Sequence, residues 1–146
     1  MIYRTFVKRL IDIVLSSLAL VILSPLLIIL AVLVRIKLGS PVIFRQQRPG
    51  YKGRIFGLMK FRTMTDERDD EGELLPDEVR LTEFGKKLRA TSLDELPEFI
   101  NILKGDMSFI GYRPERKCYI DRIVERNPRY MYLYQIRPGV TSFATL

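Results

Sequence analysis

Two adjacent carboxylates, Asp94 and Glu95, are the residues in this chain best placed to do chemistry. They stand at the start of a predicted amphipathic helix over 94–104, whose apolar side chains recur at helical spacing: Leu96, Phe99, Ile100 and Leu103. Pro97 lacks a backbone N–H and is tolerated in a first turn, so this helix is expected to begin close to Asp94. Acidic residues are also favoured at helix starts, so the pair is either a cap or a catalytic site.

Composition narrows the chemistry that these carboxylates could serve. The 146 residues include no histidine, which excludes serine–histidine and cysteine–histidine nucleophiles and histidine metal sites. The single cysteine, Cys118, can form no internal disulfide and has no partner at a zinc-binding spacing. Catalysis would therefore depend on carboxylates, lysine, tyrosine or a metal ion. The lack of an internal disulfide fits a protein that faces the cytosol.

Charge is unevenly distributed along the chain. The stretch 66–78 holds eight acidic residues and one basic residue, so the remainder carries 23 basic against 9 acidic residues, a net charge of +14. Such a surface attracts phosphate, in nucleic acid, anionic lipid or a small charged substrate. The acidic stretch has no apolar periodicity and is expected to be an exposed loop; its spacing matches no calcium-binding loop, which makes metal binding the weaker interpretation.

The segment 13–34 contains no charged residue and is long enough to cross the roughly 30 Å hydrocarbon core of a bilayer. Ser24 and Pro25 lie near its middle, where proline interrupts the hydrogen-bond ladder and favours a bend. Basic residues flank both ends, so the positive-inside rule assigns no orientation. A kinked single span and a re-entrant hairpin that enters one leaflet both remain open, whereas a cleaved signal peptide is disfavoured by the length of the segment.

Two short strands, over 41–47 and 54–63, are separated by a Pro-Gly turn and predict a β-hairpin. Alternation in the second strand places Lys60 and Arg62 on one face. The two cations are either a solvated edge of the sheet or an anion site. A short helix over 82–89 then brings Arg89 close to the carboxylate pair.

The C-terminal third is rich in turns and aromatic residues. A loop over 105–115 carries Arg113, and a helix over 115–127 is expected to bury one face, made of Tyr119, Ile120, Ile123 and Val124. Three tyrosines in the tract 129–136 suit either a membrane interface or a core seam. Arg137 follows beside another turn, so five cations stand in or near loops and could face one anionic ligand: Lys60, Arg62, Arg89, Arg113 and Arg137.

A series of motifs runs along the chain: Lys8-Arg9 with Asp12, Ser24-Pro25, the run FRQQRPG at 44–50, KFRTM at 60–64, LRATSLDELP at 88–97, GDMS at 105–108, RPE at 113–115 and RPGVT at 137–141. In this order they resemble the motifs of the bacterial sugar transferases, specifically the monotopic polyprenyl-phosphate phosphoglycosyl transferases. They extend through nearly the whole chain. Two departures are Tyr112, where the family usually has proline, and the end of the chain at Leu146, where relatives usually continue.

The resemblance implies an enzyme that transfers a sugar-1-phosphate from a UDP-sugar to undecaprenyl phosphate, releases UMP and requires Mg²⁺. It implies that Asp94 is the nucleophile, forming an aspartyl phosphosugar intermediate, and that Glu95 helps Asp94 to hold the metal. Substrate binding would fall to the basic residues and one proline of the matching motifs, namely Lys60, Arg62, Arg89, Arg113, Pro114 and Arg137. It also favours membrane re-entry, served by Lys8, Arg9, Asp12, Ser24 and Pro25.

Together these patterns predict an α+β, helix-rich fold. Residues 1–36 would form a membrane-embedded re-entrant helix kinked at Ser24-Pro25. Residues 37–146 would form a catalytic domain with a small β-hairpin and short amphipathic helices at the interface, and this domain could be truncated at its C-terminus. The expected location is the cytoplasmic face of the bacterial inner membrane. Two alternatives are an inactive membrane scaffold of the same fold and a membrane-tethered nucleic-acid binder; no nucleic acid is expected, because no nucleic-acid motif is present.

Overall fold

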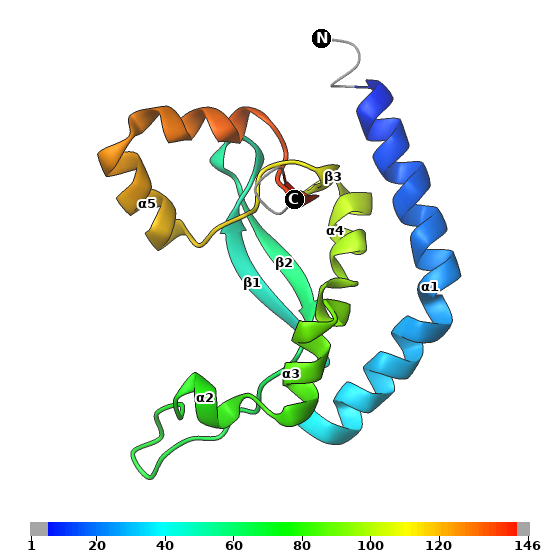
Figure 1. Ribbon diagram of the computed structural model, residues 1–146, viewed down its shortest axis with the longest axis vertical. Coiled ribbons are helices and arrows are strands. Elements are labelled where there is room, and N and C mark those ends of the chain that lie inside the picture. Colours follow the sequence, from blue (N-terminus) through cyan, green and yellow to red (C-terminus); the bar gives the residue numbers. More distant parts are fainter. Residues whose placement is uncertain (1–5, 143–146) are drawn as a thin grey trace. The chain divides into compact units, whose positions relative to one another are not determined.

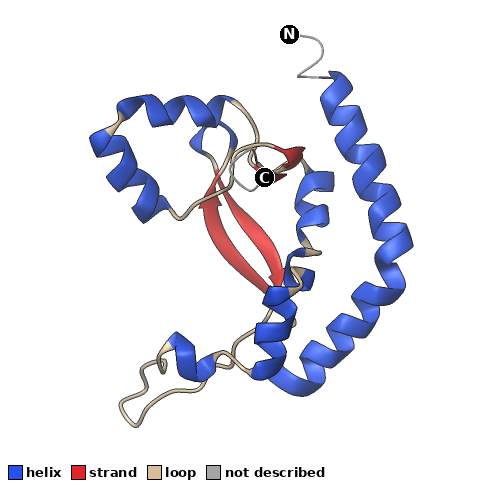
Figure 2. Cartoon of the chain, in the orientation of Figure 1, coloured by secondary structure: helices blue, strands red, loops and turns tan. Residues whose placement is uncertain are grey.

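A computed structural model describes residues 6–142 as a helix-rich α+β chain with two small sheets (Figures 1 and 2). Leu146, named above, lies outside the described residues. The α-helices are α1 (Lys8–Leu38), α2 (Asp77–Arg80), α3 (Glu83–Ala90), α4 (Glu98–Lys104) and α5 (Lys117–Arg126). The 3-10 helices are η2 (Tyr51–Gly53), η3 (Leu93–Glu95) and η4 (Pro128–Gln135), and the strands are β1 (Ile43–Pro49), β2 (Ile55–Phe61), β3 (Ser108–Ile110) and β4 (Gly139–Thr141).

The chain divides into two compact units, each assembled from separate segments. Unit 1 comprises residues 1–22, 45–58 and 98–146, and unit 2 comprises residues 23–44 and 59–97. The expected boundary between residues 36 and 37 separates a membrane-embedded part from a cytoplasmic part, and it stays a prediction. The predicted hairpin is confirmed: β1 pairs with β2, and its turn is closed by a hydrogen bond from Gly50 N to the carbonyl of Arg54 (2.8 Å).

Unit 2 is built around the C-terminal part of α1. Leu30, Val34 and Leu38 are buried on one side of that helix and pack with Phe61 of β2 and Leu88 of α3. This contact explains why the predicted helix over 82–89 forms where expected, because its apolar residue Leu88 has a partner to bury against. The unit therefore places the end of β2 and the start of α3 against one apolar cluster.

Unit 1 contains a parallel pair, β3 and β4, which the sequence patterns did not predict. Ser108 aligns with Gly139, and Ile110 with Thr141. The two backbones approach so closely beside this pair that a Cβ on Gly111 would lie 2.3 Å from the carbonyl oxygen of Arg137. Glycine is therefore required at Gly111 by the lack of space for a side chain.

The first turns of α1 are fixed to unit 1 by polar side chains. Arg9 donates to the carbonyls of Ile102 (2.5 Å) and Leu103 (2.6 Å) at the end of α4. Asp12 is 3% exposed, and its Oδ1 accepts hydrogen bonds from Ser108 Oγ (3.0 Å) and Phe109 N (3.2 Å). Buried charges need such partners, so this end of α1 is held by specific contacts and not by apolar packing alone.

The remainder of α1 exposes much of its apolar surface. The helix is long and apolar enough to cross a membrane, and only 11% of its most apolar 18-residue window is buried. A core helix of a soluble protein would be mostly buried, so the exposure indicates membrane association. The helix assignment continues through Pro25.

The aromatic C-terminal third divides into buried and exposed positions. Tyr112 and Tyr134 form an edge-to-face pair (5.9 Å between ring centroids) within a cluster that also buries Ile120 of α5. The predicted buried face of α5 is wrong for Tyr119 and Ile123, which are exposed, because only one side of this helix packs on the cluster. Of the tyrosines in the tract 129–136, Tyr134 is buried in this core cluster, as the core-seam interpretation expects, whereas Tyr132 is exposed.

Candidate functional site

Asp94 and Glu95 lie in the 3-10 turn η3, not in the first turn of the following helix as predicted. The next helix, α4, begins only at Glu98. Pro97 has no N–H to donate back to Leu93, so the α-helical ladder cannot run from Asp94 through this position. Ser92, just before η3, has a left-handed backbone (φ 55°), which is uncommon for a residue other than glycine. The turn therefore presents the two carboxylates separately from α4.

Lys60 of β2 lies beside this turn. Its Nζ donates to Glu95 Oε1 at 2.5 Å, and both side chains are largely withdrawn from solvent, with exposed fractions of 20% and 26%. Such partial burial makes the ion pair less screened than an ordinary surface pair. The strand thus holds the Glu95 carboxylate in a fixed position, next to the Asp94 carboxylate on the adjacent residue.

Arg89 reaches the same site from the last turn of α3. Its Nε donates to Thr63 Oγ1 at 3.0 Å. Thr82 caps the start of α3 by accepting from Gly85 N (3.0 Å). The predicted helix over 82–89 is present as α3, and Arg89 lies in its last turn, where its charge favours the ionised form of Asp94.

The contact between α3 and the end of β2 is unusually close. A Cβ on Gly85 would lie 1.9 Å from the carbonyl oxygen of Thr63, so no larger residue fits while the two backbones keep this spacing. Sequence reasoning overlooked Gly85 and Thr63. A glycine inside a short helix lowers the stability of that helix, so its presence at Gly85 is the signal that could have indicated a close approach of another backbone segment.

The electrostatic environment of Asp94 is mixed. The side chain is 8% exposed, and burial raises its pKa, with the charge of Glu95 adding to the effect. Lys60, the backbone N–H of Asp94 and Arg89 act in the opposite direction, since they favour the ionised form. A buried carboxylate with cations on two sides is a combination typical of reactive sites.

Arg62, predicted on the same face as Lys60, has different partners. Its side chain is buried, and it donates to the carbonyls of Met64 (2.8 Å) and Ser40 (2.5 Å) while pairing with Asp66 (2.7 Å). The interpretation as a solvated edge is wrong for Arg62, because the backbone carbonyls draw the guanidinium inward.

Three predicted ligands belong to unit 1. Arg113 is exposed and Pro114 is buried in the segment before α5. Arg137 donates from Nε to the carbonyl of Gly105 (2.9 Å) and lies over the ring of Tyr51 at 5.5 Å. The structure thus places Lys60, Arg62, Arg89, Asp94 and Glu95 in unit 2, and Arg113, Pro114 and Arg137 in unit 1. Ser24 and Pro25 lie within α1 in unit 2.

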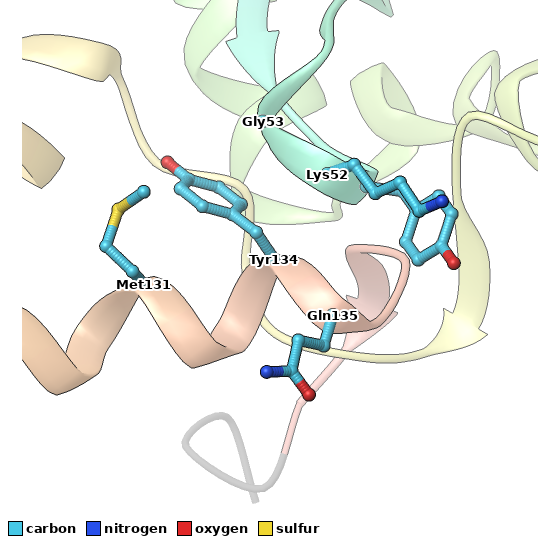
Figure 3. A pocket seen from close by; sticks show the side chains of 6 residues that line it. Lys52, Gly53, Met131, Tyr134 and Gln135 are labelled. Carbon is cyan, nitrogen blue, oxygen red and sulfur yellow. The ribbon is translucent and has the colours of Figure 1, made fainter.

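A pocket of about 350 Å³ lies between η2 and η4 within unit 1 (Figure 3). Tyr51, Lys52 and Gly53 line one side, and Met131, Tyr134 and Gln135 line the other. The Tyr134 ring stands across from the η2 turn in the close-up view. Its lining is mainly apolar, and no sequence pattern indicated it.

The donor set around Asp94 can be compared with the demands of Mg²⁺. Among residues 6–142, no group of three or more Cys, Asp or Glu side chains could hold a metal by itself. Mg²⁺ is commonly bound by one or two carboxylates together with substrate phosphates and water, so Asp94 and Glu95 fit this mode. Glu95 would share its carboxylate between the metal and Lys60.

Comparison with known proteins identifies the family. The model of the family described as "Bacterial sugar transferase" matches residues 3–146. An uncharacterized sugar transferase, EpsL, of Bacillus subtilis (strain 168) is 46% identical over 139 residues, covering 95% of this chain and 67% of the relative.

Two further relatives have names that state a reaction. The UDP-N-acetylgalactosamine-undecaprenyl-phosphate N-acetylgalactosaminephosphotransferase of Aeromonas hydrophila is 40% identical, covering 95% of this chain and 33% of the relative. The UDP-glucose:undecaprenyl-phosphate glucose-1-phosphate transferase of Escherichia coli (strain K12) is 39% identical, with coverages of 95% and 30%. This chain therefore spans only about a third of those two proteins. The resemblance of the motifs is confirmed, and the chain belongs to the bacterial sugar transferase family.

Proposed function

We propose that this protein is a phosphoglycosyl transferase that moves a sugar-1-phosphate from a UDP-sugar to undecaprenyl phosphate and so starts a bacterial glycan on its lipid carrier. The names of the two relatives above support this substrate pair. The observation that carries the proposal is the position of Asp94, a buried carboxylate next to Glu95 and acted on by the charges of Lys60 and Arg89.

Asp94 would serve as the nucleophile. One carboxylate oxygen attacks the sugar-bearing phosphorus, a P–O bond to Asp94 forms, and the P–O bond to UMP breaks with its electron pair leaving on the UMP phosphate. A phosphate oxygen of the lipid then attacks the same phosphorus, and the aspartyl bond breaks to restore the carboxylate. No proton transfer is needed in either step, which suits a site without histidine. The two steps let a soluble donor leave before the lipid acceptor arrives.

Neighbouring residues would prepare Asp94 for this role. Lys60 and Arg89 favour its ionised form and offset the charge of an approaching diphosphate. Glu95, held by Lys60, would share a bound Mg²⁺ with Asp94. When bound, Mg²⁺ neutralises charge on the phosphate oxygens.

The other arginines would bind substrate with the donors that remain available. Arg62 and Arg137 already donate to backbone carbonyls, so their contribution to a ligand would come from their other N–H groups. Arg113 is exposed and reachable from solvent, and buried Pro114 would fix its position in the loop. The role of Arg62 would be mainly to secure the end of β2.

The α1 helix would enter the cytoplasmic leaflet and return. Its first turns are bonded to α4 and β3, and its last turns pack on Phe61 and Leu88. Both ends of α1 thus contact parts of the chain that lie outside the apolar segment, so we expect both ends on the cytoplasmic face of the inner membrane, with the turn near Ser24 and Pro25. The bilayer would thereby hold the protein where it can meet its lipid substrate.

The proposal is tested by UMP release. Full-length protein in detergent or nanodiscs is incubated with a panel of UDP-sugars, undecaprenyl phosphate and Mg²⁺. Wild-type protein should release UMP with at least one donor, and Asp94→Asn should reduce the rate by at least about a thousandfold, as removal of a covalent nucleophile does. Asp121→Asn, which neutralises an exposed aspartate on α5, is the matched control and should leave the rate unchanged.

Omission of the lipid acceptor isolates the first step. With sugar-labelled donor, wild-type protein should release one equivalent of UMP in a burst and retain label on the protein, and Asp94→Asn should do neither. Undiminished UMP release by Asp94→Asn would contradict the nucleophile assignment. Absence of UMP with every donor would instead favour the scaffold alternative.

A further inference from the structure

Arg48, on β1 in unit 1, has donors that the proposed reaction does not use. Its Nη2 donates to Gln46 Oε1 at 2.6 Å. Its Nε and Nη1 are buried from solvent and have no hydrogen-bond partner among residues 6–142. Nε carries one N–H and Nη1 carries two, so most of the donors of this guanidinium lack an acceptor. A buried, unpaired donor on a charged group is costly, which makes this arrangement unusual for a purely structural arginine.

The surroundings of Arg48 are predominantly cationic. The charges that act on it come from Glu115, Arg116 and Arg113, in a segment that unit 1 also contains. Arg113 and Arg116 are exposed, Glu115 is half-buried, and the Arg48 side chain is half-buried with its nitrogens covered. Burial lowers the pKa of Arg48, Glu115 opposes this effect, and the two arginines add to it. The charges of two further guanidinium groups thus act on Arg48 against that of one carboxylate.

We propose that Arg48, together with Arg113 and Arg116, binds a phosphate group. Arginine matches phosphate better than other basic residues do, because its planar N–H donors can contact more than one oxygen. The exposed arginines would contact the phosphate from the solvent side, and the donors of Arg48, which are covered in this structure, would reach it after the side chains that cover them move aside. The phosphate belongs either to a nucleotide or to a lipid headgroup. The site rests on the proposed function at Arg113, which is already a proposed substrate ligand; the new assignments are Arg48 and Arg116, and they do not depend on the role of Asp94.

Glu115 provides the competing explanation. A rotation of its side chain could make it the acceptor for Arg48, and the cluster would then be a structural ion pair. The two explanations predict opposite effects of Glu115→Gln. If a phosphate is the partner, loss of the carboxylate removes repulsion and tightens phosphate binding. If Glu115 is the partner, the same change leaves Arg48 unpaired and lowers thermal stability without tightening phosphate binding.

The test measures binding without turnover, on full-length protein in nanodiscs of neutral lipid. Inorganic phosphate and UMP are titrated while the unfolding temperature and, separately, the equilibrium affinity are followed, since a ligand of the folded state stabilises it. In a parallel arm, the neutral lipid is replaced in part by phosphatidic acid, which offers the same phosphate chemistry as a headgroup. Preference for UMP indicates a nucleotide source, and stabilisation by phosphatidic acid indicates a lipid source.

Four variants make the result decisive. Arg48→Gln should weaken phosphate binding about tenfold or more, the size expected for lost charge-assisted hydrogen bonds. Arg48→Lys keeps the charge but loses the planar donors, and it should recover only part of the affinity. Arg122→Gln removes an exposed arginine of α5 and should have no effect beyond a small ionic one. Glu115→Gln, described above, is the fourth variant and should bind phosphate more tightly than wild type; this gain does not involve Asp94, which separates the site from the proposed nucleophile.

Two results would overturn the proposal. The first is a failure to detect the predicted binding: either Arg48→Gln and Arg48→Lys leave the affinity for phosphate and UMP unchanged, or neither compound binds and phosphatidic acid has no effect. The second is a loss of stability in Glu115→Gln with no gain in phosphate affinity. Because Glu115→Gln has a predicted gain, the test remains valid even if Arg48→Gln does not fold.

Discussion

Replacement of Asp12 by alanine should destabilise the protein severely, although Asp12 is far from the candidate nucleophile in sequence. Its carboxylate is 3% exposed and accepts two hydrogen bonds, from Ser108 Oγ at 3.0 Å and Phe109 N at 3.2 Å. Asp12→Ala leaves both donors without an acceptor in a buried place. Each such loss costs about 1–3 kcal/mol, so the expected decrease in the free energy of unfolding is about 2–6 kcal/mol.

Thermal unfolding of the full-length protein in one detergent checks this value. For a chain of this size, 1 kcal/mol corresponds to about 3 °C, so Asp12→Ala should lower the unfolding temperature by roughly 6–18 °C. Scans must share one heating rate, since unfolding of membrane proteins is often irreversible. Asp12→Asn keeps one acceptor oxygen and should fall between wild type and Asp12→Ala.

Asp121 provides the matched control. It is also an aspartate on a helix, but it pairs with Lys117 in solvent, with exposed fractions of 54% and 69%. Exposed pairs contribute about 0–1 kcal/mol, so Asp121→Ala should shift the unfolding temperature by no more than about 3 °C. In the double variant Asp12→Ala/Ser108→Ala one stranded donor is removed, and the combined loss should be smaller than the sum of the single losses. Equal shifts for Asp12→Ala and Asp121→Ala would refute the reasoning.

Three further predictions concern Asp94, the helix ends and Tyr112. Burial raises the pKa of Asp94 above its ordinary 3.8, so its contribution to stability is present below that pH and is lost as the pH rises through the raised value. Asp94→Asn should therefore unfold at a higher temperature than wild type at neutral pH, and the difference should shrink as the pH falls toward 3.8; a constant difference would contradict this. In a Cys118→Ser background, Val7→Cys and Lys37→Cys should both react with an impermeant maleimide from the cytoplasmic side only, and reaction from opposite sides would reject re-entry. The Tyr112 hydroxyl is buried without a partner among residues 6–142, so Tyr112→Phe should leave the free energy of unfolding unchanged or raise it by about 1 kcal/mol. Denaturant unfolding measures this, with Tyr132→Phe at an exposed tyrosine as the control, and a clear loss of stability would reveal a missed hydrogen bond.

Local signals in the sequence predicted the elements that depend on nearby residues. The Pro-Gly turn and the flanking apolar alternation predicted the β1–β2 hairpin, and apolar spacing predicted α3. The carboxylate pair was placed in a helix because Pro97 is acceptable in a first turn. The chain instead forms the 3-10 turn η3, and the helix α4 begins at Glu98. This helix start depends on the packing of the surrounding residues as well as on Pro97.

Features that depend on distant residues were not predictable from local patterns. The parallel pairing of β3 with β4 joins segments about thirty residues apart, and each strand is only three residues long. Alternation in β2 predicted that Lys60 and Arg62 share a face, but it could not show that Lys60 would pair with Glu95 or that Arg62 would donate to the carbonyl of Ser40. The candidate nucleophile came from a family motif, and its burial and the adjacent Lys60–Glu95 pair came from the fold.

The close contact at Gly85 also affects the acidic loop that precedes α3. The segment that contains this loop lies between Thr63 and Gly85, and its two ends approach each other where a Cβ would not fit. Met64 forms a bridge with Leu81, and Thr65 N donates to the carbonyl of Arg80 at 3.0 Å, which closes the base of the loop a second time. A loop clamped in this way can change in length and composition while Lys60 and Arg89 keep their places. It is thus a natural position at which to graft a reporter peptide, and one at which related sequences could diverge without disturbing the chemistry.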